Sequence, residues 1–138
     1  MPAFPSSRLR LASLVASSIL VACSHAPPTQ ATSPNPVRVT INSSVEVSGT
    51  PLTIRFVSVQ DSRCPTSVQC VWAGDGAVVL LIADATRSAT DTLHTTLEPK
   101  AGTFGAYRIT LVSLEPYPTA GPPPPTYLVT LRVEALPD

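Results

Sequence analysis

An alternation of apolar and polar residues with a period of two recurs along the chain from residue 37 to residue 135. In its clearest stretch Val129, Leu131 and Val133 share one parity, and Thr130 stands between the first two. Successive side chains of a strand point to opposite faces of a sheet, so this period predicts half-buried strands. The chain shows no convincing amphipathic helix in this part, and we therefore expect an all-β fold.

Breaks in the alternation suggest where the strands bend and end. The parity slips after Phe56 within one apolar run, which predicts a β-bulge. Residues 77–83, AVVLLIA, are apolar on both parities, as is typical of a central strand covered on both faces. Proline cannot donate to a ladder, so EPYPTAGPPPPT, residues 115–126, is expected to be a stiff loop inside a C-terminal hairpin.

Together these patterns predict six or seven strands in an antiparallel β-sandwich of about immunoglobulin-domain size. A small closed barrel is the alternative. Residues 37–47 are expected to be a strand or a hairpin, and Leu93 and Leu97 mark a weaker strand. The expected core consists of Val39, Ile41, Leu52, Ile54, Phe56, Val59, Val78, Leu80, Ile82, Leu93, Leu97, Tyr107, Ile109, Leu111, Val129, Leu131 and Val133.

The N-terminal segment has the layout of a secretory signal. Arg8 and Arg10 are the only charges before residue 38, and Leu11 to Ala22 is an uncharged run of apolar and small residues. A membrane-spanning helix needs about 20 apolar residues, so this run is too short to be a transmembrane anchor. We expect a signal peptide over residues 1–22.

The end of that run, LVAC at residues 20–23, resembles the lipobox of bacterial lipoproteins. The resemblance implies cleavage before Cys23, attachment of diacylglycerol and further acyl chains such as palmitate to Cys23, and a membrane anchor in the bacterial cell envelope. Ser24 directly after the cysteine is similar to residues that permit transfer to the outer membrane, facing the periplasm. Residues 23–36 would then be a lipidated cysteine with a flexible, uncharged tether, and residues 37–138 a single domain.

Charge and cysteine content narrow the expected partners. Without residues 1–22 the chain keeps seven Lys and Arg against nine Asp and Glu, and these are scattered. No basic patch is expected, so nucleic acid is excluded as a partner. Cys64 and Cys70 remain once Cys23 is lipidated, and an exported pair is expected to be oxidised to a disulfide.

The segment DSRCPTSVQCVWAG, residues 61–74, resembles a motif of small exported bacterial proteins, many of them lipoproteins. The shared pattern is Asp-Ser-Arg-Cys-Pro, a variable stretch, Cys-x-Trp-x-Gly and an apolar strand. A Tyr-x-Ile-Thr-Leu strand near the C-terminus, here from Tyr107 to Pro116, belongs to the same resemblance. The resemblance implies a fold and an exported location, and it implies no activity.

Each residue of this segment also has an expected structural role. A Cys64–Cys70 bridge would close a small ring, and Trp72 could pack its indole on the sulfurs. Asp61 could accept hydrogen bonds from its own loop, and Arg63 could pair with Asp61 or reach a carbonyl. Gly74 and Gly76 around Asp75 are expected to make a turn into the next strand.

Other chemistries fit the residues less well. A metal site could draw on Asp61, Asp75, His94 and the two cysteines, but C-x5-C without a nearby histidine is not a zinc spacing. No C-x-x-C redox pair and no G-x-S-x-G nucleophile motif is present. We therefore expect no enzyme activity, no catalytic residue, no metal and no cofactor.

The sequence thus predicts a non-enzymatic, lipid-anchored envelope protein that serves as a binding or structural module. Its expected partners are the membrane, through the lipid anchor, and an envelope protein. One alternative is an inhibitor-like recognition domain that presents the Cys64–Cys70 loop, with Val68 and Gln69 among the displayed residues. A second alternative is a metal-binding envelope protein.

Overall fold

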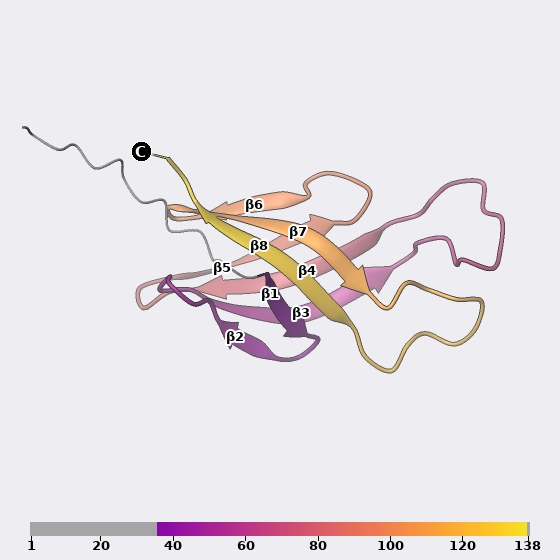
Figure 1. Cartoon of the computed structure of the whole chain (residues 1–138), viewed down its shortest axis with the longest axis horizontal. Helices are drawn as coiled ribbons and strands as arrows, with labels where there is room; N and C mark the ends of the chain where they lie inside the picture. Colours follow the sequence, from indigo (N-terminus) through magenta and orange to yellow (C-terminus); the bar gives the residue numbers. More distant parts are fainter. Residues whose placement is uncertain (1–35, 138) are drawn as a thin grey trace, which may run out of the picture.

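Residues 36–137, the part of the chain that the computed structural model describes, form eight strands in two antiparallel sheets of four (Figure 1). One sheet has the strand order β1-β8-β7-β6 and the other the order β2-β3-β4-β5, so neither closes into a barrel. The prediction of an all-β sandwich is confirmed, with eight strands in place of the six or seven expected. The strands are β1 (Val37–Thr40), β2 (Ser44–Glu46), β3 (Thr53–Asp61), β4 (Gly76–Ala83), β5 (Ser88–His94), β6 (Ala101–Phe104), β7 (Tyr107–Glu115) and β8 (Leu128–Ala135).

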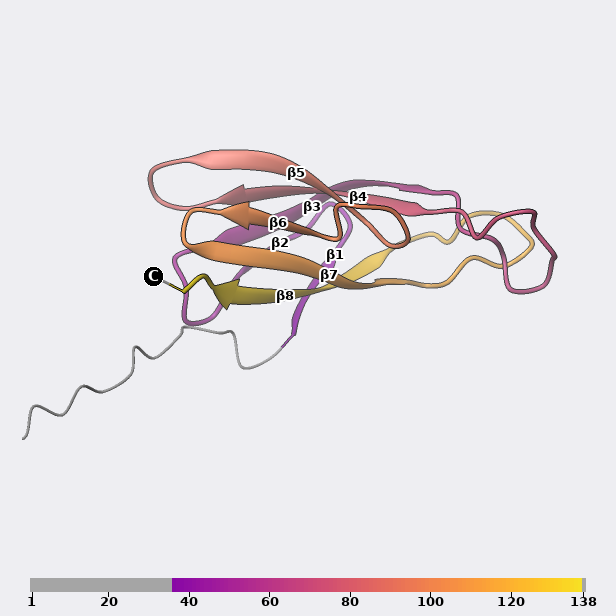
Figure 2. The same cartoon turned by 90° about the horizontal axis from the view of Figure 1, so that it is seen from above.

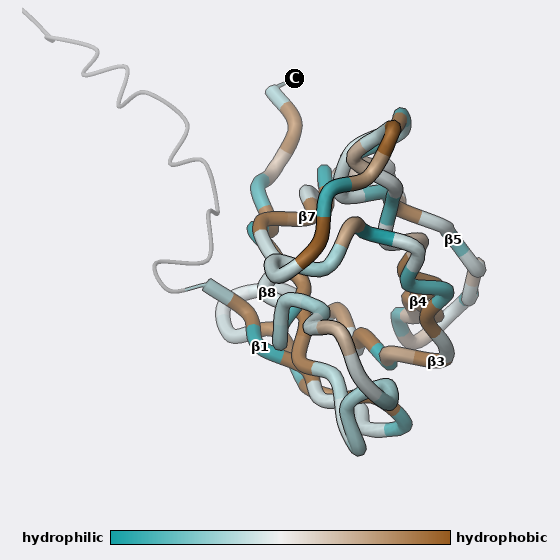
Figure 3. Tube along the Cα trace, turned by 90° about the vertical axis from the view of Figure 1, so that its right-hand side faces the viewer, coloured by the Kyte–Doolittle hydropathy of each residue, from teal (hydrophilic) through white to brown (hydrophobic). Residues whose placement is uncertain are grey.

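The two sheets lie face to face as separate layers. Seen from above, β3, β4 and β5 lie on one side and β6, β7 and β8 on the other (Figure 2), and the end-on view shows the same separation (Figure 3). One parity of each strand points between the layers, which is why the period of two is so marked. The core formed there contains Val37, Val39, Val47, Leu52, Ile54, Phe56, Val78, Leu80, Ile82, Leu93, Phe104, Ile109, Leu111, Leu114, Val129, Leu131 and Val133.

Most of the expected core is buried, with one clear error. Leu97 is 58% exposed, because β5 ends at His94 and Leu97 lies in the following turn. Ile41, Val59 and Tyr107 are only partly buried at the edge of the core. The four core residues absent from the prediction are Val37, Val47, Phe104 and Leu114. Phe104 was missed with its whole strand, because the four residues AGTF of β6 carry no alternation.

Two β-bulges account for the slips in parity. The register between β3 and β4 shifts between Phe56 and Ser58, as predicted, and that between β7 and β8 shifts between Leu111 and Ser113. The extra residue turns Val57 and Val112 outward, to 39% and 52% exposure. Each bulge thereby lets a strand send apolar residues of both parities toward the core.

Strand β4 is an inner strand as expected, but it is not covered on both faces. Val78, Leu80 and Ile82 are buried, whereas Val79 and Leu81 are only half-buried. In a two-layer sandwich only one face of each sheet meets the other sheet. The outer face of β4 is flanked instead by the polar residues of β3 and β5.

The first two strands belong to different sheets. Strand β1 pairs with β8 and β2 pairs with β3, so residues 37–47 are not the hairpin that the alternation also allowed. The chain crosses between layers at Asn42, whose φ of 65° is in the left-handed region. Asparagine tolerates this conformation better than most residues, which explains its place at the crossing.

The expected signal peptide over residues 1–22, the lipobox with Cys23 and the tether as far as residue 35 lie outside the described residues. Within residues 36–137, no helix is long and apolar enough to cross a membrane.

Two loops project from the same end of the sandwich. Residues 62–75 join β3 to β4 and residues 116–127 join β7 to β8, and both lie at the right of Figures 1 and 2, opposite the C-terminus. The motif singled out in the sequence is therefore a loop at one end of the domain. The second loop is the proline-rich segment.

Candidate functional site

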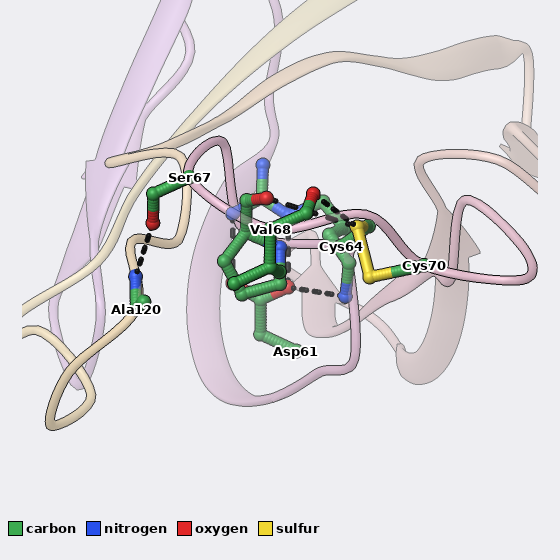
Figure 4. Close-up of a disulfide and its surroundings, with 8 residues drawn as sticks. Asp61, Cys64, Ser67, Val68, Cys70 and Ala120 are labelled. Carbon is green, nitrogen blue, oxygen red and sulfur yellow. Dashed lines mark hydrogen bonds and ion pairs between the residues drawn. A yellow bond between two sulfur atoms is a disulfide. The ribbon is translucent and has the colours of Figure 1, made fainter.

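The two cysteines of the motif form a disulfide, as predicted. Cys64 and Cys70 are bonded, with their Cα atoms 5.9 Å apart (Figure 4). The bond closes a ring around residues 65–69. Both sulfurs are thereby engaged, so neither is a thiolate that could attack a substrate or ligate a metal.

The ring closed by the disulfide is hydrogen-bonded to the proline-rich loop. The amide of Thr66 donates to the Pro118 carbonyl at 3.2 Å, and the amide of Ala120 donates to the Ser67 hydroxyl oxygen at 3.3 Å (Figure 4). On its other side, the Cys64 amide donates to the Ala73 carbonyl at 2.7 Å. The ring is thus held between two stretches of backbone, and its first half, Thr66 and Ser67, faces the neighbouring loop.

Arg63 forms the base of this end of the domain. Its side chain is bidentate on Asp61, with Nε and Nη2 each 2.8 Å from a carboxylate oxygen. Nη1 donates to the Leu114 carbonyl at 2.7 Å, and Nη2 also donates to the Pro116 carbonyl at 2.9 Å. The guanidinium lies 4.8 Å from the centre of the Tyr117 ring. Both side chains of the ion pair are about 95% buried. Arg63 therefore makes both of the contacts that the sequence left open.

Asp61 and Arg63 each stabilise the charged form of the other. Burial raises the pKa of Asp61, but the hydrogen bonds and the charge of Arg63 outweigh burial and hold that pKa below its ordinary value. The hydrogen bonds that Arg63 donates to Asp61 in turn raise the pKa of the Arg63 guanidinium. With every nitrogen of the guanidinium already donating, Arg63 serves as a brace between the two loops.

Asp75 forms a second polar cluster on the other side of the loop. One carboxylate oxygen lies 2.6 Å from Nδ1 of His94, and the other accepts the amides of Thr96 and Leu97 at 2.9 and 3.3 Å. Burial raises the pKa of Asp75, but the hydrogen bonds from His94 and these amides lower it to about 2. Asp75 therefore fixes the turn after β5 beside the motif loop.

Gly74 is required where the loop returns to the sheet. Its φ of +69° is in the left-handed region, and a Cβ there would overlap the carbonyl oxygen of Ser62. The close approach is part of a short ladder in which the Ser62 amide donates to the Asp75 carbonyl at 2.7 Å. Gly76 begins β4 and donates its amide to the Thr95 hydroxyl at 2.8 Å.

The apolar residues of the loop are turned outward. Val68 is 46% exposed, Val71 is fully exposed and Trp72 is 83% exposed. The expectation that Trp72 packs on the disulfide is therefore wrong. A hollow of about 500 Å³ lies beside Trp72 and is lined by Ser62, Trp72, Ala73, Gly74, Asp75, Thr96 and Leu97. The motif loop thus combines a buried polar base with an exposed apolar tip.

A second hollow, of about 320 Å³, lies between the ring and the proline-rich loop. Its walls include Pro65, Tyr117, Tyr127 and the buried Asp61–Arg63 pair. Because each of the three guanidinium nitrogens of Arg63 already donates within the domain, the floor of this hollow is structural. Tyr117, half exposed over Arg63, was not anticipated from the sequence, although its position between Pro116 and Pro118 could have suggested a fixed aromatic residue.

The residues considered for a metal site are not gathered together. Asp61 pairs with Arg63, Asp75 pairs with His94, and the cysteines are bonded to each other. Among residues 36–137, no group of three His, Cys, Asp or Glu side chains is placed to hold a metal ion.

In comparisons with known proteins, no family model, no curated protein and no solved structure matches the chain.

Proposed function

We propose that this chain is a non-enzymatic, exported protein held on the bacterial outer membrane by a lipid on Cys23, where it faces the periplasm and acts as a binding module. The working surface is the outer part of the loop 62–75. The anchor is supported by the lipobox-like LVAC segment after a basic start and an apolar run. The binding role is supported by the geometry at the loop end of the sandwich.

One observation carries the binding role: the side chains of Val71 and Trp72 are fully and 83% exposed on a loop that is otherwise tightly held. Three contacts restrain the loop in the absence of a partner: the disulfide, the hydrogen bonds of Arg63, and the backbone hydrogen bond from Ser62 to Asp75. A restrained loop loses little conformational entropy on binding, and tryptophan is prominent among residues that dominate binding energy.

The proposed non-enzymatic role agrees with the state of the reactive side chains. Cys64 and Cys70 are joined to each other, so neither is a free nucleophile. The hydroxyl of Ser62 donates to the Asp75 carbonyl at 2.9 Å, which gives it a structural partner. The polar groups of the motif are therefore engaged in contacts that hold the loop in its conformation.

The anchor is tested by blocking lipoprotein processing. Globomycin, which inhibits the lipoprotein signal peptidase, is expected to cause accumulation of the unprocessed chain. Cys23→Ser is expected to abolish incorporation of labelled palmitate while leaving the domain folded. Unchanged processing and membrane attachment under globomycin would contradict the anchor.

The binding role is tested at the loop tip. Val71→Ser with Trp72→Ser is expected to abolish retention of the protein's partner by the immobilised chain, without changing the melting temperature. Val112→Ser is the matched control, because Val112 is also an exposed apolar residue but lies on β7. Equal loss of retention in the control would show that the effect is not specific to the loop.

A second candidate is a recognition domain that presents the ring itself. It is favoured by the exposure of Val68, 46%, and of Gln69, on the half of the ring that faces away from the proline-rich loop. In that case Val68→Ala with Gln69→Ala should abolish capture, and Val71→Ser with Trp72→Ser should not.

A further inference from the structure

We infer that Val71, Trp72 and Leu97, here called the apolar lip, dock onto a phospholipid surface with the indole of Trp72 in the interfacial layer. The inference deepens the proposed function and rests on its lipid anchor, because it names the bilayer that carries the protein as the surface the loop binds. The lip draws on two segments, the motif loop and the turn after β5.

The composition of the lip matches a shallow membrane contact. Its three side chains are 101%, 83% and 58% exposed, and a hollow with a mainly apolar lining lies between Trp72 and Leu97. Tryptophan is enriched at membrane interfaces, where its ring rests on apolar chains while its N–H stays near water. Aliphatic side chains beside it supply buried apolar area, which sets the strength of such binding.

Insertion of the lip would bury no unpaired charge. Residues 64–74 contain no charged side chain. The nearest charges are already satisfied: Arg63 and Asp61 pair in the interior, and Asp75 is held by His94 and by backbone amides. Glu98 and Lys100, which follow Leu97, are exposed and of opposite sign. The lip therefore suits a neutral lipid surface, and anionic lipid should not be needed.

The lip is also held in shape. Asp75 accepts the amide of Leu97 at 3.3 Å, which places the turn beside the motif loop, and the Cys64 amide bonds to Ala73 next to Trp72. Because both segments are fixed by backbone hydrogen bonds, docking needs little further ordering.

The length of chain before the domain lets the loop end of an anchored domain reach the membrane. Thirteen residues separate Cys23 from Val37, and the fourteen Cα–Cα steps between these two residues reach at most about 50 Å. The nine residues of β3 span only about 30 Å, so an anchored domain can turn its loop end to the bilayer. Tethering of this kind keeps the lip at an effective concentration of about millimolar, at which even weak interfacial affinity is sufficient.

The chain offers an internal reporter, because Trp72 is its single tryptophan. The protein purified from envelope membranes is reconstituted into phosphatidylcholine vesicles, with and without phosphatidylglycerol, and into vesicles of brominated phosphatidylcholine. We expect the emission of Trp72 to shift to shorter wavelength, to be quenched by the brominated lipid and to be shielded from iodide. The shift should be equal in both lipid mixtures and should persist in high salt.

Matched variants show whether the lip causes the effect. Val71→Asp with Leu97→Asp keeps the reporter but charges the lip, and it should restore the emission of an indole in water and its quenching by iodide. Val112→Asp charges an exposed apolar position on β7 and should leave the docked spectrum unchanged. Circular dichroism confirms that both variants are folded.

Two other outcomes would overturn the inference. If the protein floats with the vesicles but Trp72 stays accessible to iodide and unaffected by brominated lipid, the anchor holds and the docking fails. If Trp72 is shielded in native envelope membranes but not in pure lipid vesicles, the lip binds a protein. Failure of the protein to float with vesicles at all, by contrast, would count against the lipid anchor itself.

Discussion

Arg63 and Trp72 lie in the same loop between β3 and β4, yet one residue is 7% exposed and the other 83%. Around Arg63 the loop turns inward, and its polar groups find partners on β3, β7 and the proline-rich loop. Around Trp72 the loop turns outward, and its apolar groups meet solvent. The base of the loop is thus buried and hydrogen-bonded like a protein interior, whereas its tip is an exposed apolar surface available for binding.

This difference separates stability from function within one short motif. A change at the base should cost free energy of unfolding, whereas a change at the tip should alter only what the loop contacts. The following experiments test that division at successive positions along the loop.

The largest effect is expected at the base. Arg63→Ala leaves the Asp61 carboxylate buried without its partner and the carbonyls of Leu114 and Pro116 without a donor. Breaking one side of a buried ion pair costs about 3 to 5 kcal/mol. Urea unfolding should show this loss, while Arg132→Ala, at an exposed position on β8, should cost far less. Equal losses in the two variants would show that Arg63 is not a brace.

A smaller effect is expected at the disulfide. Cys64→Ser opens a ring of only seven residues, and the loop-entropy estimate for such a ring is about 2 kcal/mol. The variant should unfold at a lower temperature, and Cys70 should become reactive toward thiol reagents. Two reactive thiols at residues 64 and 70 of the exported wild-type protein would contradict the bridge.

The sequence predicted this fold well, because the fold follows from a local pattern. Strand alternation and the slip after Phe56 are visible in the residues themselves, and the structure confirms two antiparallel sheets and the bulge. The disulfide also followed from simple reasoning, since only two cysteines remain after residue 23.

The division between base and tip could not be predicted in the same way. The partners of Arg63 at Leu114 and Pro116 lie more than fifty residues further along the chain, so no local sequence pattern predicts these contacts. Trp72 shares the parity of Cys70, which suggested packing on the disulfide, but residues 62–75 form no strand and parity has no meaning there. Alternation likewise places Leu97 in one strand with Leu93, but the Leu97 amide donates to Asp75 and the residue lies in the turn after β5.

At Asp75, which lies between the base and the tip of the loop, acid is expected to lower the free energy of unfolding by less than the two changes above. Its pKa is lowered to about 2 in the folded protein from 3.8, so the stabilisation is complete above about pH 4 and is lost as the pH falls toward 2. Asp75→Asn should therefore flatten the dependence of unfolding free energy on pH in this window, by about 1 kcal/mol. Glu115→Gln, at an exposed position, is the control. An unchanged slope in Asp75→Asn would show that the contacts with His94 and the turn do not stabilise the fold.

The smallest effect on stability is expected at the tip itself. Trp72→Ser removes the largest side chain of the loop, and truncating a buried tryptophan would cost about 3 to 5 kcal/mol. Because the indole is 83% exposed, we expect a change within about 0.5 kcal/mol by urea unfolding. The same variant should nevertheless lose binding, whereas Arg63→Ala should lose stability first. A large loss of stability in Trp72→Ser would mean that the indole packs on the domain in solution, and the tip would then be an extension of the base rather than a free binding surface.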